Sequence, residues 1–143
     1  MIGAGGLGCR WARAAHSRVP SESDLMLVDA DIESFKGASN AHCMHLDPTG
    51  MEKGIAALPA LAAHRTISAL EEIDQVLTSA ELVVILTGLG GGTGTGSTIE
   101  LARASRQRGA IVVVVAGLPF AEQSFRARTV SYTHLRAHET LLD

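Results

Sequence analysis

Short apolar runs alternate along the chain with segments of helical character. Three apolar runs predict strands: Leu25 to Val28, Leu82 to Leu86 and Ile111 to Val115. The last two are uniformly apolar and rich in β-branched residues, so we expect both to be buried on both faces. Helices are predicted over residues 7–18, 67–78 and 97–108. Strands that alternate with helices predict a doubly wound, mostly parallel sheet of the α/β class.

The helix boundaries are predicted from short local patterns. Ser97 and Glu100 match a capping box, which places the start of the third helix at Ser97. Gly109 is expected to end that helix. Residues 32–66 have neither helical nor strand periodicity and contain several Pro and Gly residues, so irregular structure is expected there.

Length, charge and cysteine content limit the classes of protein to which the chain can belong. A length of 143 residues is enough for one domain with its own core. The chain has 12 basic and 15 acidic residues, and this balance offers no basic field for nucleic acid. The apolar runs are too short to cross a bilayer, so no membrane insertion is expected. Two cysteines fit a reducing cytoplasm better than a disulfide scaffold.

Many of the glycines lie in two segments that each follow a predicted strand position. Gly3 to Gly8 fits the pattern G-x-G-x-x-G, and the second segment has five glycines within positions 90–96, together with Thr93 and Thr95. Beyond the carboxyl ends of parallel strands, backbone N–H groups, hydroxyls and helix N-termini bind phosphate. The segments therefore predict a polyphosphate site, with a ligand-free turn or a flexible linker as the alternatives. A P-loop is excluded, because the chain contains no Gly-Lys-Ser/Thr.

Both ends of the chain depart from the pattern. Only Met1 and Ile2 precede the first glycine segment, where a complete strand is expected, so we expect a start inside a longer sequence. Residues 130–140 have no regular periodicity and resemble the translation of a transposase adapter used in sequencing libraries. We interpret residues 129–143 as a non-native tail and residues 1–128 as the native part. An amphipathic C-terminal helix is the alternative for the tail.

The second glycine segment and the residue that follows it, Gly90 to Ser97, resemble the signature loop of the tubulin/FtsZ family. Residues 82–120 follow the FtsZ pattern of strand, loop, helix, strand and Pro-Phe, and Ile2 to Gly8 resembles the first phosphate loop of the family. The resemblance implies the N-terminal part of a GTPase domain that binds GTP with Mg²⁺. It also implies that the full-length protein self-associates into filaments in cell division, and it is compatible with membrane adaptors as partners.

The resemblance assigns roles to individual residues. Gly5, Gly6 and Gly8 would line the α- and β-phosphates, and the polyphosphate would be cradled by Gly91, Gly92, Thr93, Gly94, Thr95 and Gly96. Glu122 and Arg126 would contact the ribose and nucleotide; their spacing places them on one helix face, as it would for a solvated ion pair. No catalytic residue is assigned, because hydrolysis in the family needs an acidic loop that these 143 residues do not contain. Binding without hydrolysis is therefore expected.

Two departures from the family pattern keep other functions open. Arg10 stands where FtsZ usually has asparagine, and residues 53–59 have lost most glycines of the γ-phosphate-sensing loop. This suggests a divergent member, or a non-hydrolysing FtsZ-like interaction module. The alternative from another class is an ATP-binding adenylating enzyme of the ThiF/MoeB type, because Gly3 to Cys9 and the turn at Val28 to Asp31 resemble its ATP site. That family lacks the second glycine segment, and its Asn-x-x-Arg-Gln motif is absent here.

Three further features are weaker candidates. Residues 42–45 contain two histidines and a cysteine, but their spacing is too tight for a usual zinc site, and no metal is predicted. Asp29 and Asp31 would either bind Mg²⁺ or ribose, or cap the next helix. Trp11 and Phe35 are predicted core residues, since large aromatic side chains are mostly buried.

Overall fold

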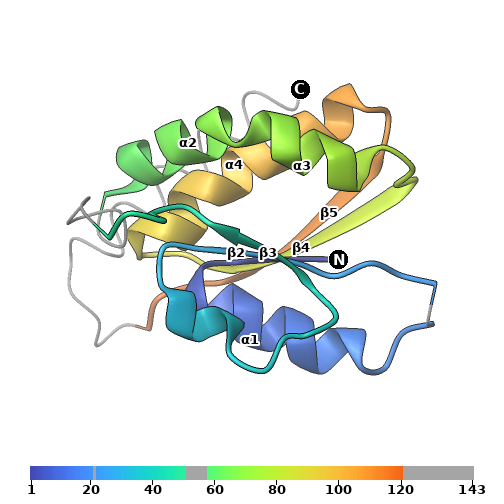
Figure 1. Ribbon diagram of the computed structural model, residues 1–143, viewed down its shortest axis with the longest axis horizontal. Helices are drawn as coiled ribbons and strands as arrows, with labels where there is room; N and C mark the ends of the chain where they lie inside the picture. The colour runs from blue at the N-terminus through green and yellow to red at the C-terminus, as the bar shows by residue number, and fades with distance from the viewer. Residues whose placement is uncertain (21, 51–57, 121–143) are drawn as a thin grey trace.

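The computed structural model describes residues 1–20, 22–50 and 58–120, which form one parallel sheet with helices on both faces (Figure 1). The elements, in chain order, are β1 (Ile2–Ala4), α1 (Gly5–His16), β2 (Met26–Asp29), the 3-10 helix η1 (Ile32–Phe35), β3 (His42–His45), α2 (Pro59–Ser68), α3 (Leu70–Leu77), β4 (Leu82–Gly88), α4 (Gly92–Gln107) and β5 (Ile111–Gly117). The strand order is β3-β2-β1-β4-β5. The predicted doubly wound sheet is confirmed.

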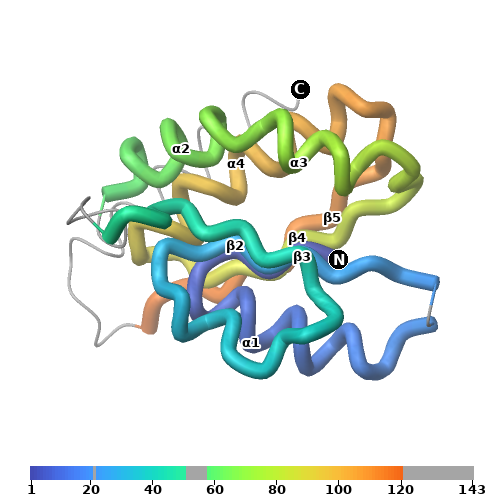
Figure 2. Tube along the Cα trace, viewed as in Figure 1, coloured from blue at the N-terminus to red at the C-terminus, as the bar shows by residue number. Residues whose placement is uncertain are grey.

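β1 occupies the centre of the sheet. It pairs with β2 on one side and with β4 on the other, so the order of the strands reverses at β1 and β4. Figure 2 shows the N-terminus, where β1 begins, beside β4. α1 covers one face, and α2, α3 and α4 cover the other (Figure 1). The chain runs outward from β1 to β2 and β3, then crosses to β4 on the other side of β1 and continues to β5. Ligands of such sheets bind at the carboxyl edge where the order reverses.

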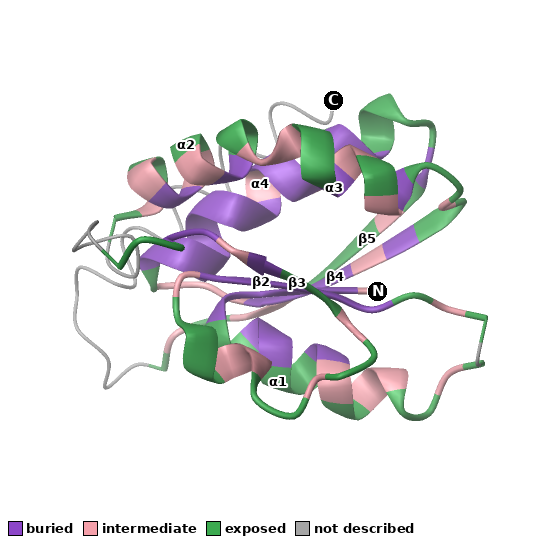
Figure 3. Ribbon diagram, viewed as in Figure 1, coloured by how far each residue is buried: buried purple, intermediate pink, exposed green. Residues whose placement is uncertain are grey.

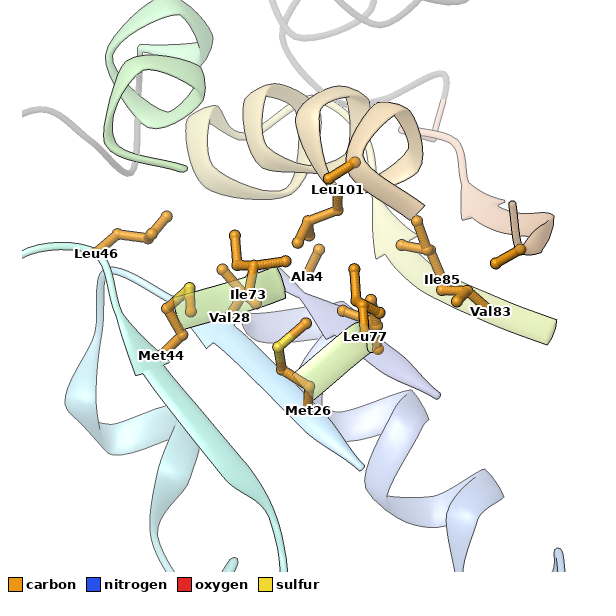
Figure 4. Packing of buried hydrophobic residues seen from close by; sticks show 13 residues of the cluster. Ala4, Met26, Val28, Met44, Leu46, Ile73, Leu77, Val83, Ile85 and Leu101 are labelled. Atoms are coloured by element: carbon orange, nitrogen blue, oxygen red, sulfur yellow. The ribbon is translucent and has the colours of Figure 1, made fainter. Parts of the chain in front are cut away.

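Side-chain alternation along the strands divides the core into two layers. Met26 and Val28 of β2 belong to the layer under α3 and α4, whereas Leu27 belongs to the layer under α1. Figure 4 shows the first layer, in which Ile73 and Leu101 meet the strand residues. The second layer is smaller and consists of Cys9, Ala12, Leu25, Leu27 and Leu86. Both layers pack the helices against the sheet.

The stretch 32–66 is more regular than predicted, since it contains η1, β3 and most of α2. In β3 only Met44 is buried, so the strand has too little apolar alternation to be recognised from its pattern. Pro59 opens α2 rather than breaking structure, because the first position of a helix does not need an N–H donor. α3 begins at Leu70, because α2 already occupies the residues before Ala69.

β5 forms as predicted, but its predicted burial on both faces is wrong. It lies at the edge of the sheet, where Ile111 is 69% and Val113 is 45% exposed (Figure 3). Trp11 is also less buried than expected, at 36% exposed, and its ring lies against Gly117. Phe35 is half-buried against the layer under α1. Residue type alone could not show which neighbours would cover these side chains.

Candidate phosphate-binding site

Two helix N-termini meet at the carboxyl edge of the two central strands. α1 follows β1 directly, and α4 begins four residues after the end of β4. Both helices start on the left in Figure 1. Gly5, with φ of +74°, lies so close to α4 that a Cβ on it would be 2.9 Å from the backbone nitrogen of Gly94. The structure therefore brings the two glycine segments into contact, although they lie far apart in the sequence.

Neither of these helix N-termini is capped by a side chain of the described residues. No side chain caps α1 at Ala4 or α4 at Gly91, and neither first turn contains an acidic residue. By contrast, α3 has Glu71 and Glu72 in its first turn. Unpaired N–H groups and aligned peptide dipoles give each helix start about half a positive charge. Two such starts in contact form a site suited to an anion.

Thr93 and Thr95 lie in the first turn of α4 but have different environments. The Thr95 hydroxyl accepts a hydrogen bond from the N–H of Gly90 at 3.1 Å. This bond links the first glycine of the segment to the start of α4. Thr93 is 5% exposed, and within the described part of the chain its buried hydroxyl has no hydrogen-bond partner. Such a group costs about 1–3 kcal/mol if it stays unpaired. An orphaned hydroxyl beside two uncapped helix starts fits a phosphate oxygen.

Several of the predicted glycines are required by packing inside the protein. A Cβ on Gly8 would lie 2.2 Å from a carbonyl oxygen of β4, and a Cβ on Gly96 would lie 2.0 Å from the carbonyl oxygen of the first residue of α2. A Cβ on Gly94 would lie 2.5 Å from the last carbonyl oxygen of β4. These glycines let α1 and α4 approach their neighbours closely. Their contact with a nucleotide stays a prediction.

Gly6 differs from those three glycines. The nearest atoms to a Cβ on Gly6 belong to Asp29 and Ser34, at 3.7 and 3.8 Å, which is ordinary van der Waals contact. Packing therefore does not demand glycine at this position. A ligand that approaches the N-terminus of α1 would explain it, because glycine exposes the backbone N–H groups.

The start of α4 corrects the capping-box prediction. The helix begins at Gly92, so Ser97 and Glu100 lie inside it. The Ser97 hydroxyl donates to the carbonyl oxygen of Thr93 at 2.5 Å, and Glu100 forms an ion pair with Arg103 at 2.7 Å. Gly109, with φ of +86°, follows the helix end, as predicted. The earlier start places Gly92, Thr93 and Gly94 themselves in the first turn, where their N–H groups have no partner within the helix.

Asp29 and Asp31 have separate tasks. Asp31 caps η1 by accepting a backbone hydrogen bond at 3.0 Å, which confirms the cap prediction for this residue. Asp29 is 5% exposed at the end of β2. Its carboxylate accepts hydrogen bonds from the Ser34 hydroxyl and, at 2.7 Å, from the next backbone N–H. Asp29 thus lies beside Gly6, on the flank of the cradle formed by the starts of α1 and α4.

The remaining candidates offer no second site. In β3, His42 and Cys43 are exposed, and His45 hydrogen-bonds the carbonyl oxygen of Ala30 at 2.8 Å through Nε2. The described ranges hold no group of three His, Cys, Asp or Glu side chains able to bind a metal. Cys9 is fully buried, and this burial, with a smaller contribution from the negative charge of Asp29, raises the pKa of its thiol to about 12. A thiol in this environment is inert.

Some predicted residues cannot be placed. Glu122, Arg126, residues 53–57 of the divergent segment and the tail 129–143 lie outside the described residues. In the ranges 1–20, 22–50 and 58–120, no helix is long and apolar enough to span a membrane.

Comparison with known proteins decides the family. The model of the tubulin/FtsZ family GTPase domain matches residues 1–141. The chain belongs to the tubulin/FtsZ family. Among curated relatives it is similar to the cell division protein FtsZ of Haloferax mediterranei, with 28% identity over 90% of this chain and 34% of the relative. It is also similar to cell division protein FtsZ 2 of Haloferax volcanii, with 32% identity over 91% of this chain and 32% of the relative.

The fold comparison agrees with this family assignment. A solved structure described as an empty FtsZ dimer from M. jannaschii superposes with a TM-score of 0.84 at 24% identity, over 97% of this chain and 41% of the other. A structure of CetZ from Methanosaeta thermophila superposes with a TM-score of 0.81 at 21% identity, over 99% and 42% of the two chains. This likeness shows the tubulin/FtsZ fold. The present chain spans about a third of the length of the curated relatives it matches.

Proposed function

We propose that this chain binds GTP at the cradle formed by the N-termini of α1 and α4, as part of a filament-forming cell-division protein of the FtsZ type. The observation that carries the proposal is the unpartnered, buried hydroxyl of Thr93 beside two helix starts that no side chain of the described residues caps. The family match to a GTPase domain and the names of the FtsZ relatives support guanine nucleotide as the ligand.

The cradle suits the phosphates of the nucleotide. In this proposal the N–H groups of Gly5, Gly6, Gly92 and Thr93 donate to phosphate oxygens, and the Thr93 hydroxyl supplies a further donor. Mg²⁺ would accompany the phosphates, since it is usually bound by substrate phosphates, waters and one or two carboxylates rather than by an all-protein cage. Glu122 and Arg126 are proposed contacts to the ribose and nucleotide.

The proposal for these residues is binding without hydrolysis. Residues 1–128 carry the binding function, and residues 129–143 contribute nothing to it. Self-association into cytoplasmic filaments is proposed for the whole protein, supported by the FtsZ relatives and by the dimer named among the similar structures. A chain that kept the fold but lost nucleotide binding would instead be an interaction module.

Calorimetric titration of the folded chain with GTP, GDP and ATP tests the proposal. Binding of GTP and GDP in preference to ATP supports it, and circular dichroism of the same sample shows that the chain is folded. Preferential binding of ATP would favour the adenylating-enzyme alternative. No binding to a folded chain would favour the interaction module.

A further inference from the structure

A second concave site lies at the opposite end of α1 from the cradle. It has a volume of about 340 Å³ and lies between the last turn of α1, Leu25 before β2 and the loop 37–41 before β3. Its position is the amino edge of the sheet, so no part of the phosphate cradle lines it. Nothing in the proposed GTP-binding function uses this cavity.

Arg13 is the charged group that dominates this amino-edge cavity. Its side chain is half-buried, and the described residues give it neither an ion pair nor a hydrogen bond. Gly37, with φ of +71°, passes so close that a Cβ on it would lie 3.4 Å from Nη2 of Arg13. The residues that line the cavity include no Asp or Glu. A guanidinium is thus held at the cavity with its hydrogen-bonding capacity unused.

The other lining groups limit what the cavity can accept. His16 is fixed by a hydrogen bond of 2.7 Å between its Nε2 and the carbonyl oxygen of Ser23, and the Ser17 hydroxyl donates within α1 at 2.8 Å. Leu25 and Ala38 supply an apolar wall that belongs to the core layer under α1. Apart from Arg13, His16 and Ser17, the polar side chains that line the cavity are those of the exposed residues Ser39 and Asn40.

The charge of the site favours a single small anion. The last carbonyl groups of α1 carry partial negative charge at this end of the helix, and the guanidinium of Arg13 opposes it. A polyphosphate would therefore be disfavoured here. A carboxylate matches the planar guanidinium fork with two parallel hydrogen bonds. An apolar wall beside that fork selects a carboxylate attached to a short hydrocarbon group.

We propose that the amino-edge cavity is a binding site for a carboxylate with a small branched apolar body, held by Arg13 against Leu25 and Ala38. Two sources share this chemistry: a free short-chain acid, and a peptide whose last residue is apolar. The full chain, labelled with ¹⁵N, is titrated with 4-methylpentanoate and, separately, with Gly-Gly-Leu. The neutral controls are 4-methylpentanamide and the C-terminal amide of Gly-Gly-Leu.

Saturable shifts of the Arg13 side chain and of the amides in loop 37–41 are expected with at least one acid, and not with its amide. Arg13→Gln should weaken binding about tenfold or more, because a charge-assisted hydrogen bond pair is lost. Arg13→Lys should retain part of the affinity. Arg10→Gln is the matched control, since Arg10 lies exposed on the same helix outside the cavity, and it should bind like the parent chain.

The variant Ser39→Tyr tests the cavity independently of α1. It adds a bulky side chain at an exposed loop residue that lines the cavity, so it should abolish binding even where Arg13→Gln fails to fold. Tighter binding of the peptide would identify a chain terminus as the source, and tighter binding of 4-methylpentanoate a free acid. Equal shifts with acid and amide, equal loss in Arg10→Gln and Arg13→Gln, or no saturable shift with either acid would overturn the proposal.

Discussion

The two glycine segments look alike in the sequence, but the structure uses them differently. Each has one glycine in the left-handed region, Gly5 at +74° and Gly90 at +108°, and each leads into a helix without a side-chain cap in the described residues. The second segment adds two buried hydroxyls, of which Thr95 is bonded internally and Thr93 is not. The first segment has none and is flanked by the buried carboxylate of Asp29.

A glycine-rich pattern therefore combines two physical requirements. At Gly8, Gly94 and Gly96 the absence of a Cβ lets a helix pack against backbone atoms of the protein itself. At Gly6 the surrounding protein leaves room for a side chain, so the backbone is open to a ligand. Substitutions that separate the packing requirement from the ligand requirement therefore test the site.

The largest effect is expected for Gly96→Ala, because the new methyl group would lie 2.0 Å from the carbonyl oxygen of Pro59. α2 and α4 would have to separate, which should lower the free energy of unfolding by about 2–3 kcal/mol after the gain in helix propensity. Urea denaturation measures the change. The control is Gly109→Ala. No atoms lie within 4 Å of the Cβ position of Gly109, but its φ is +86°, so the loss of stability in this variant reports backbone strain alone. A smaller loss for Gly96→Ala than for this control would contradict the packing role.

An intermediate effect is expected from the two threonines. Thr95→Val removes the acceptor of the Gly90 N–H and should destabilise the fold by about 1–2 kcal/mol. Thr93→Val removes a hydroxyl that has no partner in the described residues, so the free energy of unfolding should stay unchanged or rise slightly. Thermal unfolding of both variants measures the difference. Equal destabilisation by the two substitutions would show that Thr93 has a structural partner.

Cys9 reports on the packing of the first segment, because it directly follows Gly8. Burial raises the pKa of its thiol to about 12 from an ordinary value of 9.0. The stability from keeping the thiol neutral is therefore complete below about pH 9 and decreases as the pH rises toward 12. At pH 8, iodoacetamide should modify the exposed Cys43 and leave Cys9 intact. Gly8→Ala should make Cys9 reactive, as measured by mass spectrometry; continued protection would mean that α1 accommodates the methyl group.

The smallest effect on stability is expected for Gly6→Ala. Its methyl group meets Asp29 and Ser34 only at 3.7 and 3.8 Å, so the free energy of unfolding should stay within about 0.5 kcal/mol of the parent value or rise. Binding of GTP should nevertheless weaken, because the methyl group occupies the approach to the N-terminus of α1. Chemical denaturation and calorimetry on the same preparation separate the two effects. A clear loss of stability would place Gly6 with the packing glycines.

Much of the fold could be predicted because it depends on local patterns. The apolar runs at β2, β4 and β5 and the glycine segments between elements were sufficient for the parallel sheet and for the location of the site. The start of α4 could not be predicted, since Ser97 and Glu100 imitate a capping box while making other contacts. The exposure of β5 depends on its position at the sheet edge, which its own residues do not encode.

The residues of the phosphate-binding site could be predicted from the sequence, but the different environments of these residues could not. The sequence pattern places Gly5 and Gly94 in one phosphate site, but Gly6 and Gly8 look equivalent in it, because the difference between them lies in backbone atoms of β4. The different environments of Thr93 and Thr95 likewise depend on where α4 begins. The cavity beside Arg13 had no sequence signal, since it arises from the contact between the end of α1 and the loop 37–41.

The most direct test of the phosphate cradle is the calorimetric affinity for GTP of the parent chain and of Thr93→Val. Saturable binding of GTP is expected for the parent chain, and the affinity of Thr93→Val should be at least about tenfold lower with no loss of stability. A folded parent chain that does not bind GTP, or a Thr93→Val variant that binds GTP as tightly as the parent, would contradict this expectation.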